Sequence, residues 1–181
     1  MTLAFAQMSN TRLGEARGEE LPEKENSVTV RIIGHVRNEV PSGKVDDWGE
    51  IASEVVLDEE YKPSLEGIEQ FSHIIVIFWM HQVDEYRPKV RPQGRTDIPE
   101  QGTFATRTPF RPNPIGISAV KLLSRKGPIL KVIGLDCYDN TPVLDIKPYN
   151  AVDRGRVEIE IPDWMRKLME ERETDNPRYL Y

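Results

Sequence analysis

The chain has 181 residues, 38% of them hydrophobic and 30% charged, with a formal net charge of −6. This length allows one domain with a substantial core, and the negative charge argues against indiscriminate electrostatic binding to nucleic acid. The longest apolar run, residues 74–80, is far shorter than the ~20 residues that span a bilayer, and we find no signal-peptide pattern. We therefore expect no membrane partner.

The first half of the chain predicts a leader followed by short strands. Residues 1–26 are polar and aperiodic, which is typical of a flexible leader. Residues 28–36 (VTVRIIGHV) alternate at period two and predict a strand with an interruption at Gly34. A second strand is predicted at residues 51–61 and a short helical turn at 62–70. Residues 71–82 (FSHIIVIFWMHQ) are apolar on both faces, which is typical of a central strand.

The second half begins with a proline-rich connection at residues 83–101, and connections of that length are commonly functional or disordered. Further strands are predicted at 102–106, 115–124, 128–138, 142–149 and 157–161. Asp163 is predicted to cap a final amphipathic helix. Together these elements predict a mostly β fold: a single antiparallel β-barrel of about seven strands with short helices, including one after the last strand. The barrel domain should cover residues 27–162, and residues 163–181 should form a C-terminal helix and tail.

The sequence lacks the patterns of phosphate-binding loops, metal sites and disulfide bonds. The twelve glycines form neither of the two phosphate-cradling motifs, GxGxxG and GxxxxGK[ST]. His73 and His81 fall on one predicted strand, about 26 Å apart at 3.3 Å per residue, so they cannot share an ion and we expect no metal site. The single cysteine, Cys137, excludes an internal disulfide and predicts a cytoplasmic protein.

The stretch FATRTPFRPNPIGISAV, from residue 104 to residue 120, combines three prolines with polar side chains. The prolines restrict the backbone and predict a stiff, polyproline-like rod over residues 108–114. Such a rod would preorganise Arg107, Arg111 and Asn113 for binding. The alternative, weighed equally, is a stiff corner at the barrel rim in which Arg111 bonds nearby carbonyl groups.

Residues 134–149 form the second polar stretch. Residues 139–142 (DNTP) have turn chemistry, and Asp136 and Asp139 flank the turn, where carboxylates either cap backbone N–H groups or accept a proton. Asp145 and Lys147 share one strand face, and mutual pairing is the favoured interpretation. With His81 and Gln82 at the end of the buried strand, these stretches predict a rim pocket built from residues 81–82, 107–117 and 135–147.

Residues 87–111 contain six basic and two acidic side chains, on a chain that is acidic overall. This basic window predicts either a localised anionic partner or a solvated loop that happens to be basic, and charge alone does not separate the two.

Four blocks of the chain resemble the signature blocks of the TsaA/TrmO family of tRNA methyltransferases. They are GIEQFSHIIVIFWMHQ, RPQGR, GTFATRTPFRPNPIGIS and GLDCYDNTPVLDIKPY, and the match runs from about residue 32 to residue 149. The resemblance implies a β-barrel that forms a homodimer and binds S-adenosylmethionine without a GxGxxG motif. It also implies N6-methylation of threonylcarbamoyladenosine at tRNA position 37. Asn140 replaces the family's usual turn glycine, and because asparagine tolerates positive φ we expect the turn to survive.

The resemblance and the chemistry of methyl transfer together assign roles to residues. Cofactor contacts are expected at His81, Gln82, Arg107, Ile117, Leu135 and Asp136. Asp136 and Asp139 are candidate catalytic bases, and Arg111, Asn113, Lys147, Lys89 and Arg91 are candidate contacts to the tRNA anticodon arm. Longer family members carry an additional C-terminal domain, whereas this chain ends soon after its final helix. The alternative function is a non-catalytic β-barrel that binds S-adenosylmethionine or a nucleotide as a sensor or partner protein.

Overall fold

The computed structural model describes residues 27–43, 47–150 and 160–175. The chain divides into two compact units, residues 1–31 and 32–181, and each is described by itself. The described part of the first unit, residues 27–31, is exposed and has no regular secondary structure. The predicted leader at residues 1–26 lies outside the described residues.

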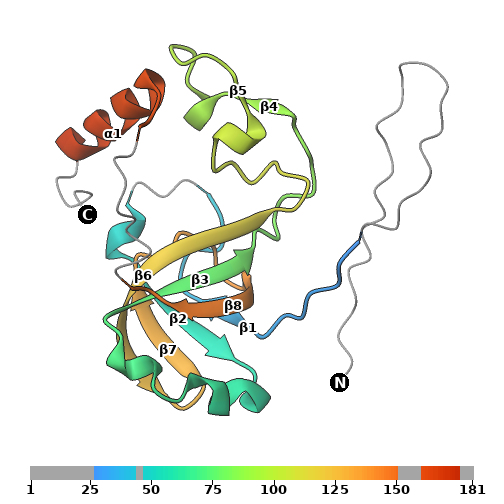
Figure 1. Ribbon diagram of the computed structural model, residues 1–181, viewed down its shortest axis with the longest axis vertical. Coiled ribbons are helices and arrows are strands. Elements are labelled where there is room, and N and C mark those ends of the chain that lie inside the picture. Colours follow the sequence, from blue (N-terminus) through green and yellow to red (C-terminus); the bar gives the residue numbers. More distant parts are fainter. Residues whose placement is uncertain (1–26, 44–46, 151–159, 176–181) are drawn as a thin grey trace. The chain divides into compact units, whose positions relative to one another are not determined.

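Six strands of the second unit form a closed antiparallel barrel (Figure 1). In chain order they are β1 (Gly34–Arg37), β2 (Ala52–Leu57), β3 (His73–Trp79), β6 (Ile115–Lys126), β7 (Ile129–Ile133) and β8 (Pro142–Pro148). Around the barrel the order is β1-β2-β7-β6-β3-β8, and each hydrogen-bonded pair is antiparallel. The predicted fold class is confirmed, with six barrel strands in place of about seven.

The remaining elements are short, apart from the final helix. Strands β4 (Lys89–Val90) and β5 (Gln101–Gly102) pair as a separate two-stranded ribbon. Among the described residues, five 3-10 helices lie at Trp48–Glu50, Glu59–Leu65, Ile68–Gln70, Pro92–Gly94 and Thr103–Ala105. Helix α1 (Asp163–Asp175) follows the last strand, as predicted, and Asp163 is its first residue rather than its cap.

Buried side chains alternate along the strands, as the pleat of a strand requires. On β3, Ile74, Val76 and Phe78 are buried in the barrel interior, whereas Ile75 and Ile77 are only half-buried. The prediction that this strand is buried on both faces is therefore wrong in part. The buried core cluster also includes Val36, Val55, Leu57, Leu65, Val120, Leu122, Leu130, Val132, Leu135, Cys137 and Val143.

A glycine allows close packing at two points in the barrel wall. A Cβ at Gly34 would lie 2.2 Å from the carbonyl oxygen of Val56 on the neighbouring strand β2. A Cβ at Gly116 would lie 2.2 Å from the ring of Phe78, which pairs with it across β3 and β6. Any larger residue at either position would have to push the paired strand or the core ring aside.

The predicted strands 51–61 and 128–138 end earlier in the structure, at Leu57 and Ile133, and three others differ more. The first strand starts at Gly34, because the register sets Gly34 opposite Leu57, the last residue of β2, and the ladder ends there. Val28 and Val30, which the period-two pattern placed in this strand, lie outside it and are 87% and 54% exposed. In the predicted strand 102–106, only Gly102 belongs to a strand, and a 3-10 turn follows it. The predicted strand 157–161 falls mostly outside the described residues.

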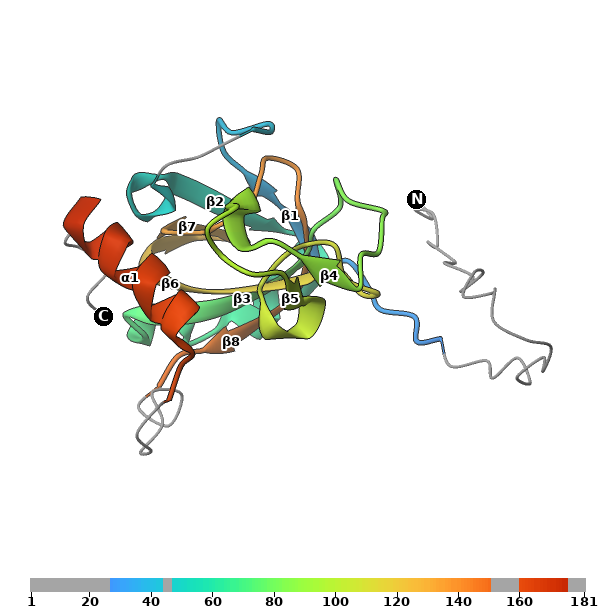
Figure 2. The same cartoon turned by 90° about the horizontal axis from the view of Figure 1, so that it is seen from above.

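The strand directions bring three connections to one end of the barrel. Since neighbouring strands are antiparallel, β1, β3 and β7 end where β2, β6 and β8 begin. The connections there are residues 38–51, described except for 44–46, residues 80–114, here called the excursion, and residues 134–141. We call the three connections together the rim. Figure 2 shows β4, β5 and α1 gathered at this end of the barrel.

Charged side chains join α1 to the excursion. The guanidinium of Arg95 is paired with both Asp97 and Glu171, and Lys167 Nζ lies 2.8 Å from an Asp97 oxygen. These four residues are called the ionic clamp below. Arg95 belongs to the RPQGR block, so that block contributes a structural contact.

Candidate rim site

The turn between β7 and β8 is held by Asp139. Its Oδ1 accepts a hydrogen bond from the backbone N–H of Asn38 at 2.9 Å, and its Oδ2 accepts one from the Asn140 amide at 2.6 Å. Asn140 adopts φ of 59°, so the prediction that asparagine supports this turn is confirmed. Asp139 thus ties the first and third rim connections together, and its predicted role as a base stays a prediction.

Asn38 is a rim residue that the sequence did not single out. Its side-chain Nδ2 donates to Ser53 Oγ and to the Cys137 carbonyl, each at 3.1 Å, and its side-chain Oδ1 accepts from the Val40 N–H at 3.0 Å. The surrounding residues NEVPSG indicated only a turn, because a hydrogen-bonding hub of this kind depends on partners about 100 positions away in the chain.

The end of β3 contributes His81 and Gln82. Gln82 Nε2 donates to the Pro41 carbonyl at 2.7 Å, which joins the excursion to the first rim connection. Partial burial and, second, nearby His35 lower the pKa of His81, so its imidazole is neutral at pH 7. The strand ends at Trp79, so the premise that His73 and His81 share one strand is wrong.

The proline-rich segment is bent. Residues 109 and 111–113 are bends, and tight contacts join the Arg111 N–H to the Pro109 carbonyl at 2.7 Å and the Ile115 N–H to the Asn113 carbonyl at 2.8 Å. The prediction of a straight polyproline-like rod is therefore wrong. Each proline fixes its own φ and disfavours the α region for the residue before it, but neither restriction prevents the i→i+2 turns centred on Phe110 and Pro114.

Arg111 holds this bent segment together, as the alternative interpretation predicted. Its Nη1 donates to the carbonyl of Thr103 at 3.2 Å and to that of Thr106 at 2.8 Å. Its guanidinium also lies 5.6 Å from the ring centroid of Phe104. A contact between Arg111 and substrate stays a prediction, and these bonds give the side chain a structural role beside it.

The other predicted positions divide between the rim and the barrel wall. Asp136 is exposed on the third rim connection, whereas the Leu135 side chain is fully buried in the core, so only its backbone can contact a ligand. Ile117 is 56% exposed on the outer wall of β6. Lys147 pairs with Asp145 at 2.6 Å, as favoured from the sequence, and lies opposite Ile75, away from the rim.

The six basic side chains of the window fall into two groups. Arg87 is paired with Glu85 at 2.7 Å, and its guanidinium lies 3.9 Å from the Phe110 ring centroid. Arg95 is held in the ionic clamp, and Arg111 bonds carbonyl groups. These three side chains act mainly within the protein.

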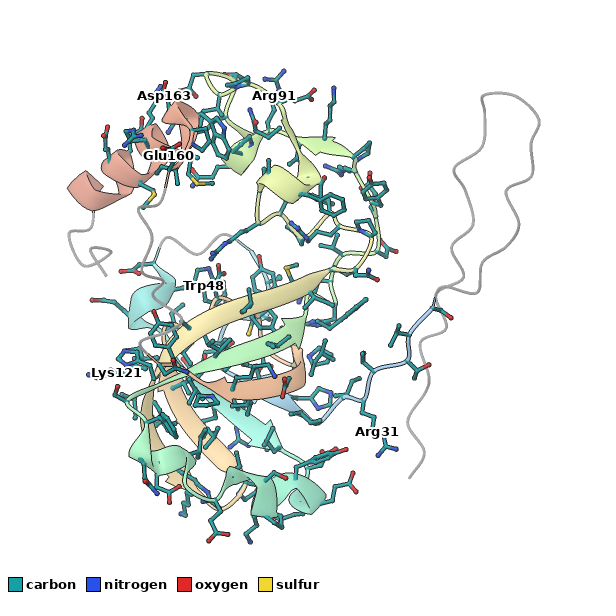
Figure 3. The ribbon with its side chains drawn as sticks, in the orientation of Figure 1. Arg31, Trp48, Arg91, Lys121, Glu160 and Asp163 are labelled. Carbon is teal, nitrogen blue, oxygen red and sulfur yellow. The ribbon has the colours of Figure 1, made fainter. Side chains whose placement is uncertain are left out.

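The second group is available to a partner. Arg91 has one long contact, 3.3 Å from its Nη1 to the Ile98 carbonyl, and Figure 3 shows it on the outer part of the excursion. Lys89 and Arg107 are exposed, and neither has a hydrogen-bond or ion-pair partner among the described residues. An anionic partner would therefore meet Lys89, Arg91 and Arg107 first.

Burial of Cys137 raises the pKa of its thiol to about 12, which keeps it protonated and unreactive at neutral pH. In the described part of the chain, no three His, Cys, Asp or Glu side chains gather closely enough to hold a metal ion. None of the described helices is long and apolar enough to cross a membrane.

An open depression of about 610 Å³ lies on the outer wall. It is lined by Arg37, Glu54, Ser124, Lys126, Gly127, Ile129 and Lys131. It extends from Arg37, the last residue of β1 before the rim, to Gly127, in the turn at the opposite end of the barrel. Arg37 and Glu54 pair with each other, and none of the residues predicted for the site lines this depression.

The fold and the rim define a class of protein: a small antiparallel β-barrel whose polar and partly basic rim is built from three connections. Over residues 36–153 the chain matches the family described as the tRNA-methyltransferase O N-terminal domain. The chain belongs to this family, and the family predicted from its sequence blocks is confirmed.

Three known proteins illustrate the similarity. A probable S-adenosyl-L-methionine-binding protein of Archaeoglobus fulgidus is 41% identical over 128 residues, which make up 68% of this chain and 34% of that protein. The tRNA (adenine(37)-N6)-methyltransferase of Escherichia coli is 47% identical over 92 residues, 48% of this chain and 39% of that enzyme. The crystal structure of TrmO from Pseudomonas aeruginosa matches with a TM-score of 0.61 at 29% identity, covering 76% of this chain and 63% of that one. This chain therefore spans between one third and two thirds of these proteins' lengths.

Proposed function

We propose that this chain is an S-adenosylmethionine-dependent tRNA methyltransferase that methylates N6 of adenosine 37. The observation that carries the proposal is the family match over residues 36–153, which includes all the rim connections. The Escherichia coli relative is named for this reaction, and the Archaeoglobus fulgidus relative is named for binding the cofactor. We further propose that the substrate adenosine carries a threonylcarbamoyl group, and that the protein is cytoplasmic.

The chemistry of the rim side chains fits the cofactor. Arg107 is an exposed cation suited to a carboxylate, and Asp136 is an exposed carboxylate suited to an ammonium group or to ribose hydroxyls. The neutral imidazole of His81 and the carbonyl oxygen of Gln82 add uncharged polar groups. When bound, S-adenosylmethionine supplies a methyl group activated by its sulfonium. Ile117 lies on the outer wall of β6, whereas most of the other predicted contacts lie on the rim. A cofactor that contacts both would have to extend from the rim onto the outer wall.

Proton removal is the task left to the chain's own carboxylates. The target N6–H is made more acidic by a carbamoyl substituent, so a single carboxylate can serve as base. Both oxygens of Asp139 already accept hydrogen bonds that hold the turn. Because Asp136 is exposed and Asp139 is half-buried, we assign proton transfer to Asp136 ahead of Asp139. Lys89 and Arg91 would contact anticodon-arm phosphates, while Arg111, Asn113 and Lys147 stay proposed substrate contacts of lower rank.

The outer wall of β3 and β6 supports a homodimer. Ile77 pairs with Ile117 and Trp79 with Ile115 across these strands, and Ile115 and Ile117 are 44% and 56% exposed. A second copy of the chain would remove this apolar wall from water, which is a common basis for homodimers. It would also enclose Ile117, which accounts for a predicted cofactor contact that lies outside the barrel.

Titration calorimetry and a methyl-transfer assay test the function in sequence. The purified chain should bind S-adenosylmethionine but not ATP, and it should transfer a methyl group to threonylcarbamoylated tRNA, measured by mass spectrometry of the nucleosides. Sedimentation velocity of the same preparation should report a dimer. Asp136→Asn should abolish turnover, and Asp139→Asn should destabilise the turn as well as reduce turnover.

The name of the Archaeoglobus fulgidus relative favours a second candidate, a non-catalytic S-adenosylmethionine-binding module. Cofactor binding without methyl transfer to any tRNA preparation would support that module and contradict the enzyme. Binding of neither ligand would contradict both.

A further inference from the structure

Phe104 is the most exposed large apolar side chain among the described residues of the second unit. It is 76% exposed, and it belongs to the 3-10 turn Thr103–Ala105 in the excursion. It has no part in the buried core cluster, whereas its neighbour Thr103 is buried. The fold therefore gains little from an aromatic ring at this position, and a ring in water carries a transfer cost that a partner would remove.

The turn that carries this ring is held firmly. Thr103 Oγ1 donates to the Arg87 carbonyl, and the Thr103 N–H donates to the Pro88 carbonyl at 3.1 Å. The Thr103 carbonyl accepts from the N–H and the hydroxyl of Thr106 and from Arg111. None of these hydrogen bonds involves the Phe104 side chain. The turn therefore holds the ring in an exposed position, and its hydrogen bonds do not require the ring. Such preorganisation lowers the entropy lost on binding.

Cations without acidic partners lie close to this turn along the backbone. Lys89 pairs through its backbone with Gly102, two residues before Phe104, and Arg107 follows three residues after it. Both are exposed and lack a partner among the described residues. The Arg111 guanidinium lies over the ring itself, 5.6 Å from its centroid. An apolar protein partner would have to desolvate these charges, whereas a nucleotide would match the ring with its base and the cations with its phosphates.

We propose that Phe104 is a stacking platform for an unpaired base of the RNA substrate, with Lys89 on an adjoining phosphate. Sequence-tolerant recognition of single-stranded RNA commonly combines such a ring with flanking cations. The inference rests on the proposed function and assigns the bound RNA segment: an unpaired loop rather than a helical stem. Base contact at Phe104 would hold the loop over the rim while the target adenine is turned toward the cofactor.

The test is RNA binding by the full chain with Phe104→Ala and Phe104→Trp. The probe is a synthetic anticodon stem-loop in which each loop adenine in turn is replaced by fluorescent 2-aminopurine. We expect Phe104→Ala to weaken binding about tenfold to a hundredfold and to abolish quenching at one loop position, while Phe104→Trp retains both. S-adenosylmethionine affinity and the salt dependence of RNA binding should stay as in the wild type.

Two further variants separate stacking from other effects. Phe71→Ala removes another exposed aromatic ring, at the end opposite the rim, and should leave RNA affinity unchanged. Lys89→Gln should lower the salt slope by about one unit, which Phe104→Ala should not do.

The outcomes are distinct. Wild-type RNA affinity in Phe104→Ala, with the wild type active, overturns the stacking inference and leaves the proposed function intact. The stacking inference is also overturned if Phe104→Ala keeps its RNA affinity but no longer sediments as a dimer. That result would mean that the Phe104 ring contacts a second copy of the chain. A wild-type chain that neither binds the stem-loop nor methylates tRNA overturns both proposals.

Discussion

The barrel and the excursion are built by different means. The barrel wall is a continuous antiparallel ladder around apolar side chains, and Val55, Ile74 and Leu130 are fully shielded from water. The excursion spans 35 residues with only two short strands, β4 and β5, and it relies on side chains that bond backbone carbonyls, such as Arg111 and Thr103. The comparison teaches that the barrel owes its stability to burial, whereas the excursion owes its shape to specific polar contacts.

The largest expected contrast compares two buried isoleucines. Ile74→Ala, on β3, should lower the free energy of unfolding by about 4 kcal/mol because it leaves a cavity in the core. Ile98 is equally buried but lies in the excursion, outside the core cluster, so Ile98→Ala should loosen the excursion locally. Urea unfolding measures the first effect, and amide exchange of residues 87–106 measures the second. An equal loss of global stability in both variants would contradict the division.

A smaller contrast compares two glycines. Gly34→Ala would bring a Cβ to 2.2 Å from the Val56 carbonyl oxygen, and we expect a loss of about 2 kcal/mol as β1 shifts off β2. Gly102, in β5, has open space around its Cβ direction and φ of −58°, so Gly102→Ala should be neutral or slightly stabilising. Thermal melts of the two variants report the difference. A destabilised Gly102→Ala would mean that the excursion is packed as tightly as the barrel.

The smallest effect concerns the ionic clamp between the excursion and α1. Hydrogen bonds from Arg95 lower the pKa of Glu171 and, together with a bond from Lys167, that of Asp97. A carboxyl group with a lowered pKa in the folded state stabilises above its unfolded pKa of about 4, and this contribution is lost as the pH falls through the folded value. The clamp should therefore be complete at pH 7 and should weaken below about pH 4.

Amide exchange of residues 163–171, corrected for the intrinsic rate at each pH, measures the clamp. Glu171→Gln should raise exchange there at pH 7 without lowering barrel stability. The neighbouring exposed Glu170→Gln is the matched control and should have no effect. Because the clamp residues are partly exposed, added salt should act in the same direction as acid. Protection unaffected by all three changes would show that apolar contacts hold the helix instead.

The sequence by itself determined the fold class, the location of most barrel strands and two of the three segments that form the rim. Period-two patterning and turn residues are local signals, and they located β2, β3, β6, β7 and β8, although β2 and β7 end four and five residues before their predicted ends. The family blocks were also readable directly, and the DNTP turn was predicted correctly because positive φ at Asn140 depends on that residue alone.

Only the tertiary structure decided where β1 begins, what Arg111 bonds and which cations remain available to a partner. Val28 and Val30 have a perfect strand pattern, yet a strand forms only where a neighbouring strand offers its backbone groups. The basic window of the sequence contains six cations, and the structure divides them through contacts such as the one between Arg95 and Glu171, 76 positions apart. The alternation of buried and exposed side chains is a local property of the sequence, so the barrel could be predicted. The hydrogen-bond and ion-pair partners of the rim are distant in sequence, so the side chains that stay available for binding could not be predicted.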